Sequence, residues 1–262
     1  MIAHRWELWL IGWGAAVVLL GTLYLRQRRT GDATAVDTGW GTGLALCALL
    51  YGVLAPGPVV QRLAICLPLG IENLRVALLV LYRHDGGEDR RYQELRRRWR
   101  EKGREQLTFA IFYQAQGLLA AGLSVPALFA SFNRHDSLAP VQWAGIALWV
   151  VAVAFEIVSD SQLTRFRRDP ANKGGVMDRG LWRYSRHPNY FFQTLTWVAY
   201  ALIAVTAPWG WLAFLAPALV LSLILFVTGV PAAEESSLRS RGDAYRDYQA
   251  RTSVFVPWLP KR

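Results

Sequence analysis

The chain has 262 residues, of which 53% are apolar, and its 29 Lys and Arg outnumber its 19 Asp and Glu to give a net charge of +10. A mean hydropathy of +0.19 beside that charge indicates apolar and basic regions that alternate along the chain, which excludes an evenly basic or evenly apolar protein. Nothing in the composition suggests a separate soluble domain.

Seven apolar runs predict an all-α, polytopic membrane protein of about seven transmembrane helices, because each is long enough to cross a hydrocarbon core about 30 Å thick. The predicted spans are residues 6–25, 38–55, 59–82, 106–130, 140–158, 189–206 and 209–231. The first run does not resemble a secretory signal, since Glu7 interrupts its start and Arg26 follows it closely. We expect residues 1–262 to form a single membrane domain.

The basic residues gather on one side of the predicted spans. If the N-terminus is outside, the inner segments carry 25 of the 29 Lys and Arg, and the outer segments carry only Arg5 and Arg134. Basic residues are retained on the cytoplasmic side, so we predict an outside N-terminus and a cytoplasmic C-terminus. The composition favours a bacterial inner membrane. Because the clusters flank spans, we expect membrane lipids rather than nucleic acid as partners, and no obligate protein partner is evident.

The longest polar stretch, residues 83–105, predicts a short Arg-rich helix. Tyr92, Leu95 and Trp99 recur at helical spacing, so we expect this helix to lie along the bilayer surface with its arginines toward lipid phosphates. A solvated basic linker is the alternative.

Glu72 and Arg75 are ionisable residues inside a predicted span, where charge is costly and indicates function. Their i, i+3 spacing places them on one helix face, so one interpretation is that they neutralise each other. The other interpretation puts Glu72 in a substrate cavity, as a proton donor or as a hydrogen-bonding group for a carbonyl oxygen. Asp37, at the start of the predicted span 38–55, either caps that helix or lines a site.

The segment between the fifth and sixth spans, residues 159–189, is predicted to be a polar loop that can bind an anion. Its end reads GLWRYSRHPNY from Gly180 to Tyr190. Two guanidiniums, an imidazole and an amide fall within seven residues, and Pro188 favours a helix start whose N–H groups attract anions. A phosphate or carboxylate of a cofactor would fit there.

These blocks resemble the steroid 5-alpha-reductase family, especially its bacterial membrane enzymes. The resemblance is strong from Ser159 to Pro257, through SDSQLTRFRRDPAN, GLWRYSRHPNYF and YRDYQARTSVFVP, and weaker at VDTGWG and GEDRRYQELR. It implies a seven-helix membrane reductase that binds NADPH from the cytoplasm and transfers hydride to a carbonyl-conjugated C=C bond of a lipophilic substrate: a steroid, an isoprenoid or an unsaturated lipid. No G-x-G-x-x-G follows a strand, so helix ends and loops would hold the cofactor.

Four residues match family positions one by one. Asp160 matches the aspartate used near the adenosine and ribose, Arg167 an arginine suited to phosphate, Asn189 the cofactor asparagine and Arg75 the third-span arginine. Each has a structural alternative, since Asp160 could pair with Arg165 and Asn189 could cap its helix. We expect five further residues to contact the cofactor: Arg165, Tyr184, Arg186, His187 and Glu235. We expect no metal site.

The chain departs from the family pattern at three places. Glu72 stands where better-known steroid reductases have a tyrosine, and Gln193 where they have a glutamate. We predict that Glu72 is the catalytic residue, acting as a neutral carboxyl that donates to a developing enolate oxygen. The family's paired histidines are missing, and Glu234 and Glu235 stand roughly in their place.

That last departure leaves a second interpretation open. RHPNY followed by Glu234 and Glu235 also resembles membrane methyltransferases of the isoprenylcysteine carboxyl type, which bind S-adenosylmethionine. Adjacent carboxylates suit a ligand with an ammonium and a sulfonium. This pattern explains SDSQLTRFRRDP and RTSVFVP less well than the reductase pattern does.

Overall fold

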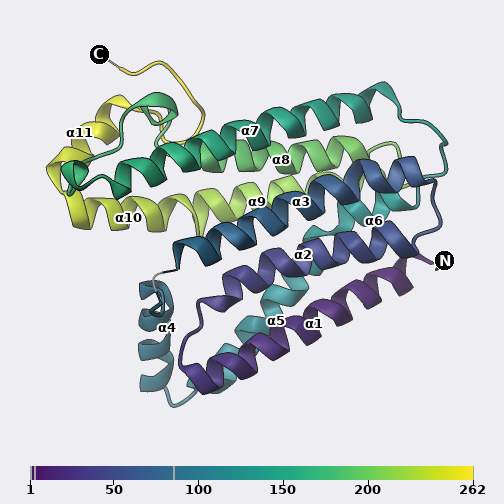
Figure 1. Ribbon diagram of the computed structural model, residues 1–262, viewed down its shortest axis with the longest axis horizontal. Coiled ribbons are helices and arrows are strands. Elements are labelled where there is room, and N and C mark those ends of the chain that lie inside the picture. The colour runs from purple at the N-terminus through teal and green to yellow at the C-terminus, as the bar shows by residue number, and fades with distance from the viewer. Residues whose placement is uncertain (1, 3, 85, 262) are drawn as a thin grey trace. The chain divides into compact units, whose positions relative to one another are not determined.

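The computed structural model describes residue 2, residues 4–84 and residues 86–261, and these residues form helices and no strand (Figure 1). The chain divides into two compact units. The N-terminal unit comprises Met1–Gln142 with Ile203–Ala213, and the C-terminal unit comprises Trp143–Leu202 with Phe214–Arg262. The prediction of a single membrane domain stays a prediction.

The N-terminal unit is a helical bundle. Its helices are α1 (Arg5–Thr30), α2 (Ala35–Leu54), α3 (Val59–Arg83), α4 (Arg90–Glu101), α5 (Glu105–Leu123) and α6 (Val125–Ser131). Helix α2 packs against α1, α3 and α5, and Figure 1 shows α1, α2 and α3 side by side. Glycines allow this close packing: a Cβ atom on Gly41 would lie 2.7 Å from the carbonyl oxygen of Asn73, and one on Gly12 would lie 2.7 Å from the hydroxyl of Tyr51.

The predicted span 106–130 is divided into α5 and α6. The division falls at Ser124, two residues before Pro126, which lacks the N–H that would continue the α5 hydrogen-bond ladder. The Ser124 hydroxyl lies 3.0 Å from the hydroxyl of Tyr51 and donates to the Ala121 carbonyl. The proline therefore breaks the helix where side-chain hydrogen bonds hold the junction.

The C-terminal unit contains three long helical segments and a polar end. Its elements are α7 (Pro140–Arg168, which begins in the other unit), η1 (Pro170–Asn172), η2 (Gly180–Arg183), α8 (Pro188–Ala204), α9 (Leu215–Phe226), α10 (Val230–Arg241) and α11 (Asp243–Arg251); η3 (Gly210–Phe214) precedes α9. Helices α7 and α8 meet where Phe155 stacks on Phe192 with ring centroids 5.0 Å apart, and where the Trp149 indole donates to Tyr200.

Five helical segments are long and apolar enough to cross a membrane, which is consistent with an integral membrane protein. They are Arg5–Thr30, Val59–Tyr82, Glu105–Ser131, Pro140–Arg168 and Gly210–Arg241. The predicted spans 38–55 and 189–206 correspond to α2 and α8, which are helices but are not among these five. The all-helical prediction is confirmed, and the number seven stays a prediction.

The structure shows what covers the apolar face of α4, whereas its predicted position along the bilayer surface stays a prediction. The helix forms as expected, and Asp89 caps it by accepting a hydrogen bond from the Arg91 N–H. Its apolar face, however, packs on the protein: Tyr92 is buried, and Trp99 contacts Phe109 edge to face with centroids 4.7 Å apart. Aromatic residues of α5 therefore cover the apolar face of α4.

Candidate functional site

The carboxylate of Glu234, on α10, is the centre of the polar end of the C-terminal unit. It accepts hydrogen bonds from Arg186 at 2.9 and 3.2 Å, from His187 Nε2 at 2.9 Å, from the Tyr245 hydroxyl at 2.8 Å and from the Gln249 amide. These donors come from the loop before α8 and from α11. One acid therefore joins the loop before α8 to the consecutive helices α10 and α11.

Arg186 uses its other donors within the protein as well. Its Nη1 atom donates to the carbonyl oxygens of Gln249 and Thr252, both at 2.9 Å, and its backbone N–H donates to Ser253 at 2.8 Å. A guanidinium so fully bonded fixes the loop against the C-terminal segment. The predicted contact between Arg186 and a cofactor stays a prediction, and it would require some of these bonds to break.

Tyrosines of α11 hold the same loop from another side. The buried Tyr248 hydroxyl donates to the carbonyl of Trp182, whose indole N–H donates to Ser159 on α7 at 3.0 Å. Burial raises the pKa of Tyr248, and burial together with the hydrogen bond to Glu234 raises the pKa of Tyr245. Both hydroxyls therefore remain protonated donors at neutral pH.

Asp160 and Asn189 lie together, as the sequence predicted for two residues of one site. The Asn189 amide nitrogen lies 3.4 Å from Asp160 Oδ1, and Asp160 is 8% exposed. The Asn189 side-chain oxygen is buried and has no hydrogen-bond partner among the described residues. An unsatisfied buried carbonyl is rare in proteins and indicates a position that a ligand or water completes.

Glu156 is a residue that the sequence reasoning missed. It lies one helical turn before Asp160 on α7 and is 4% exposed. The available signal was its position inside the predicted span 140–158, because an ionisable residue within a span indicates function.

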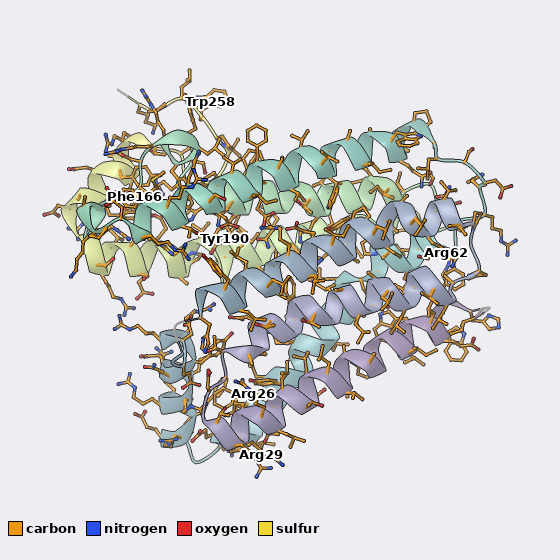
Figure 2. The ribbon with its side chains drawn as sticks, in the orientation of Figure 1. Arg26, Arg29, Arg62, Phe166, Tyr190 and Trp258 are labelled. Carbon is orange, nitrogen blue, oxygen red and sulfur yellow. The ribbon has the colours of Figure 1, made fainter. Side chains whose placement is uncertain are left out.

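Arg165 and Arg167 do not lie in a loop, as predicted, but in the last turn of α7, which continues ten residues past the predicted end of its span. Both side chains are exposed. Basic residues stabilise a helix C-terminus by interacting with its dipole, which explains why the helix continues here. Phe166, between them, marks this end of α7 in Figure 2.

The remaining predicted residues of this unit have different surroundings. The His187 ring stacks on Tyr190, labelled in Figure 2, with centroids 5.5 Å apart. Tyr184 is 39% exposed. The Glu235 side chain is 65% exposed and pairs with Arg239, so it points away from the Glu234 cluster.

Glu72 and Arg75 form an ion pair in the N-terminal unit. The Arg75 guanidinium donates to both carboxylate oxygens, at 2.9 and 2.6 Å, and the Glu72 side chain is 6% exposed. This geometry agrees with the interpretation that the two residues neutralise each other. In this state Glu72 accepts hydrogen bonds and offers no donor. Asp37, the other candidate of this unit, accepts from the Tyr92 hydroxyl at 2.6 Å and from Arg91 at 3.0 Å, so it anchors α4.

Comparison with known proteins gives one match. Residues 23–252 match a family described as "Protein of unknown function (DUF1295)". No curated protein and no solved structure matches the chain. Since the match covers most of the chain, including both units, this protein belongs to the DUF1295 family.

Proposed function

We propose that this protein is a membrane-embedded, NADPH-dependent reductase that transfers hydride to a carbonyl-conjugated C=C bond of a lipophilic substrate. The observation that carries the proposal is the contact between Asp160, in α7, and Asn189, at the start of α8, with the Asn189 oxygen left without a partner among the described residues. The proposal extends the resemblance of Ser159–Pro257 to the steroid 5-alpha-reductase family. In the proposed topology this end faces the cytoplasm, where NADPH is present.

The residue types at this end fit a dinucleotide phosphate. Asp160 is an acceptor suited to ribose hydroxyls, and Asn189 offers both a donor and an unused acceptor. Arg165 and Arg167, on the same helix as Asp160, supply guanidiniums suited to phosphate groups. When bound, NADPH supplies the hydride. The protein would bind it, hold it against an apolar substrate that enters from the bilayer, and exclude water.

The loop before α8 would act as a rigid support. Because Glu234 and the C-terminal segment fix Arg186 and His187, the start of α8 at Asn189 is held in one position. Such fixed surroundings lower the cost of ordering a cofactor site when the ligand binds.

The same network weakens the methyltransferase interpretation. That interpretation rests on Glu234 and Glu235 receiving an ammonium or a sulfonium. Glu234 already accepts five hydrogen bonds from the protein, and Glu235 points away from it and pairs with Arg239. Two carboxylates that do not face a common space offer no shared cation site.

We propose a changed role for Glu72. Because both of its oxygens accept from Arg75, it would position that guanidinium as a hydrogen-bond donor and would not itself act as the proton donor. Glu72→Gln should then lower kcat while leaving NADPH affinity unchanged. A catalytic carboxyl that protonates the substrate would instead give a pH profile that disappears in Glu72→Gln.

The proposal is tested by the melting temperature of the detergent-solubilised protein with NADPH or S-adenosylmethionine. A ligand stabilises the native state in proportion to the logarithm of its concentration over its dissociation constant, so the true cofactor should act at micromolar levels. We expect a shift with NADPH that is lost in Arg167→Gln and kept in Arg246→Gln, a control on the exposed face of α11. A shift with S-adenosylmethionine alone would overturn the reductase proposal, and no shift with either would favour a binding protein.

A further inference from the structure

A cavity of about 230 Å³ lies in the N-terminal unit, among the end of α1, the start of α2 and the end of α3. Its lining combines polar and apolar side chains. The polar ones are Arg26, Asp32, Thr34, Thr38 and His84, and the apolar ones are Leu23, Ala35, Val80 and Leu81. All of these residues belong to one unit, and none of them belongs to the candidate cofactor site.

The cavity contains polar groups that the protein does not satisfy. In the part of the chain that the structure describes, no group forms a hydrogen bond or a salt bridge with the Arg26 guanidinium. The Thr38 hydroxyl is likewise buried without a hydrogen-bond partner. Asp32 is occupied, because its side chain accepts from the Thr34 N–H at 2.9 Å and lies 3.5 Å from His84 Nε2. Arg26 is solvent-exposed, and its charge helps to lower the pKa of Asp32 without a direct hydrogen bond between the two side chains. The Arg26 guanidinium and the Thr38 hydroxyl are therefore the donors that this cavity offers to a ligand.

The cavity adjoins an apolar surface. Leu81, which lines the cavity, is more than 40% exposed, as are Leu25 and Leu78 near the same ends of α1 and α3. Helices α1 and α3 are both long and apolar enough to span a membrane, and if both are spans, their common end would lie at the membrane interface. A ligand that joins an anionic group to alkyl chains matches both the cavity and this surface.

We propose that this cavity binds the phosphate diester of a membrane phospholipid. The Arg26 guanidinium would take the phosphate oxygens, with the Thr38 hydroxyl as a further donor, while the acyl chains run along the exposed leucines of α1 and α3. The polar linkers between helices would hold the cavity in shape, since Thr34 Oγ1 accepts from the Asp89 N–H at 2.9 Å and the Ala33 N–H donates to Glu88 at 3.0 Å. The site is independent of the proposed reductase chemistry.

The test measures lipid binding to the delipidated, full-length protein in a mild detergent by native mass spectrometry. Arg26→Gln removes the charge, and Arg29→Gln is the matched control, because Figure 2 shows both arginines at the same end of α1 and Arg29 does not line the cavity. We expect phosphatidylglycerol to bind the wild type and Arg29→Gln alike, and to bind Arg26→Gln about tenfold more weakly, since a charge-assisted hydrogen bond is worth roughly that factor.

Two further ligands identify what is recognised. Diacylglycerol has the same chains without phosphate, and glycerol 3-phosphate has a phosphate without chains. The proposal requires both to bind at least about tenfold more weakly than the phospholipid, because diacylglycerol loses the phosphate contacts and glycerol 3-phosphate loses the acyl-chain contacts. Equal binding of diacylglycerol, equal binding of glycerol 3-phosphate, or unchanged phospholipid binding in Arg26→Gln would each overturn it.

Discussion

Replacing Glu234 should destabilise the C-terminal unit more than any substitution of its neighbour Glu235. Glu234→Ala removes the acceptor of five hydrogen bonds and leaves Arg186, whose side chain is 12% exposed, with two unpaired N–H groups. Breaking a buried ion pair costs about 3–5 kcal/mol. Because Arg186 keeps two carbonyl acceptors, we expect a loss of about 3 kcal/mol, at the lower end of that range.

Glu234→Gln keeps the shape but turns one acceptor into a donor that faces other donors, so we expect a loss of about 2 kcal/mol. Glu235→Ala is the control: its exposed i, i+4 pair with Arg239 should be worth less than about 0.5 kcal/mol. The assay is denaturant unfolding in detergent micelles, with trypsin cleavage of the C-terminal segment as a local readout. Equal losses of unfolding free energy for Glu234→Ala and Glu235→Ala would refute the role assigned to this network.

Three further predictions concern the N-terminal unit. Hydrogen bonds from Arg91 outweigh the effect of burial and hold the pKa of Asp89 below its ordinary value. The ionised Asp89 should therefore stabilise the protein above about pH 4, and this stabilisation should be lost as the pH falls through the lowered pKa. The melting temperature should fall more between pH 6 and pH 3.5 for the wild type than for Asp89→Asn. Gly41→Ala should cost about 1–3 kcal/mol of unfolding free energy because its Cβ would meet the Asn73 carbonyl, whereas Gly14→Ala, with nothing within 4 Å, should be neutral or stabilising. Tyr92→Phe removes the hydrogen bond to Asp37 and should cost about 1 kcal/mol, with faster trypsin cleavage in α4; unchanged cleavage would contradict that anchoring.

Apolar run length predicted where the helices lie, because a span must satisfy its backbone hydrogen bonds internally and must be long enough to cross the membrane. It predicted the ends less well. Helix α7 continues to Arg168, since its last turns are polar and a hydropathy pattern ends where the apolar residues end. Pro126 indicated a break near Ser124, but the apolar residues on either side made residues 106–130 look like one continuous span.

The arrangement of the candidate site residues could be predicted only in part, and their roles stay predictions. Asp160 and Asn189 lie within hydrogen-bond distance, as the family resemblance implied, although no periodicity in the sequence could bring them together. The protein partners of Arg186, which are Glu234, Gln249 and Thr252, lie 48 to 66 residues away and could not be predicted from residue type. Long-range pairing of this kind is decided by tertiary structure.

For α4, the helical pattern correctly identified an apolar face but could not identify what covers it. A helical projection places Tyr92 and Trp99 on one face but does not distinguish whether a membrane surface or a cluster of aromatic residues covers them. The covering residues Phe109 and Phe112 lie on α5, where they read simply as part of a span.

The proposed reductase function is tested most directly by an equilibrium titration of the purified protein with NADPH, following the fluorescence of the reduced nicotinamide, beside Asn189→Ala. We predict saturable, micromolar binding to the wild type and binding at least about tenfold weaker to Asn189→Ala, because that variant loses hydrogen bonds at a desolvated site. Absence of saturable binding to the wild type, or equal affinity in the two proteins, would contradict the assignment of this end of α7 and α8 to the dinucleotide.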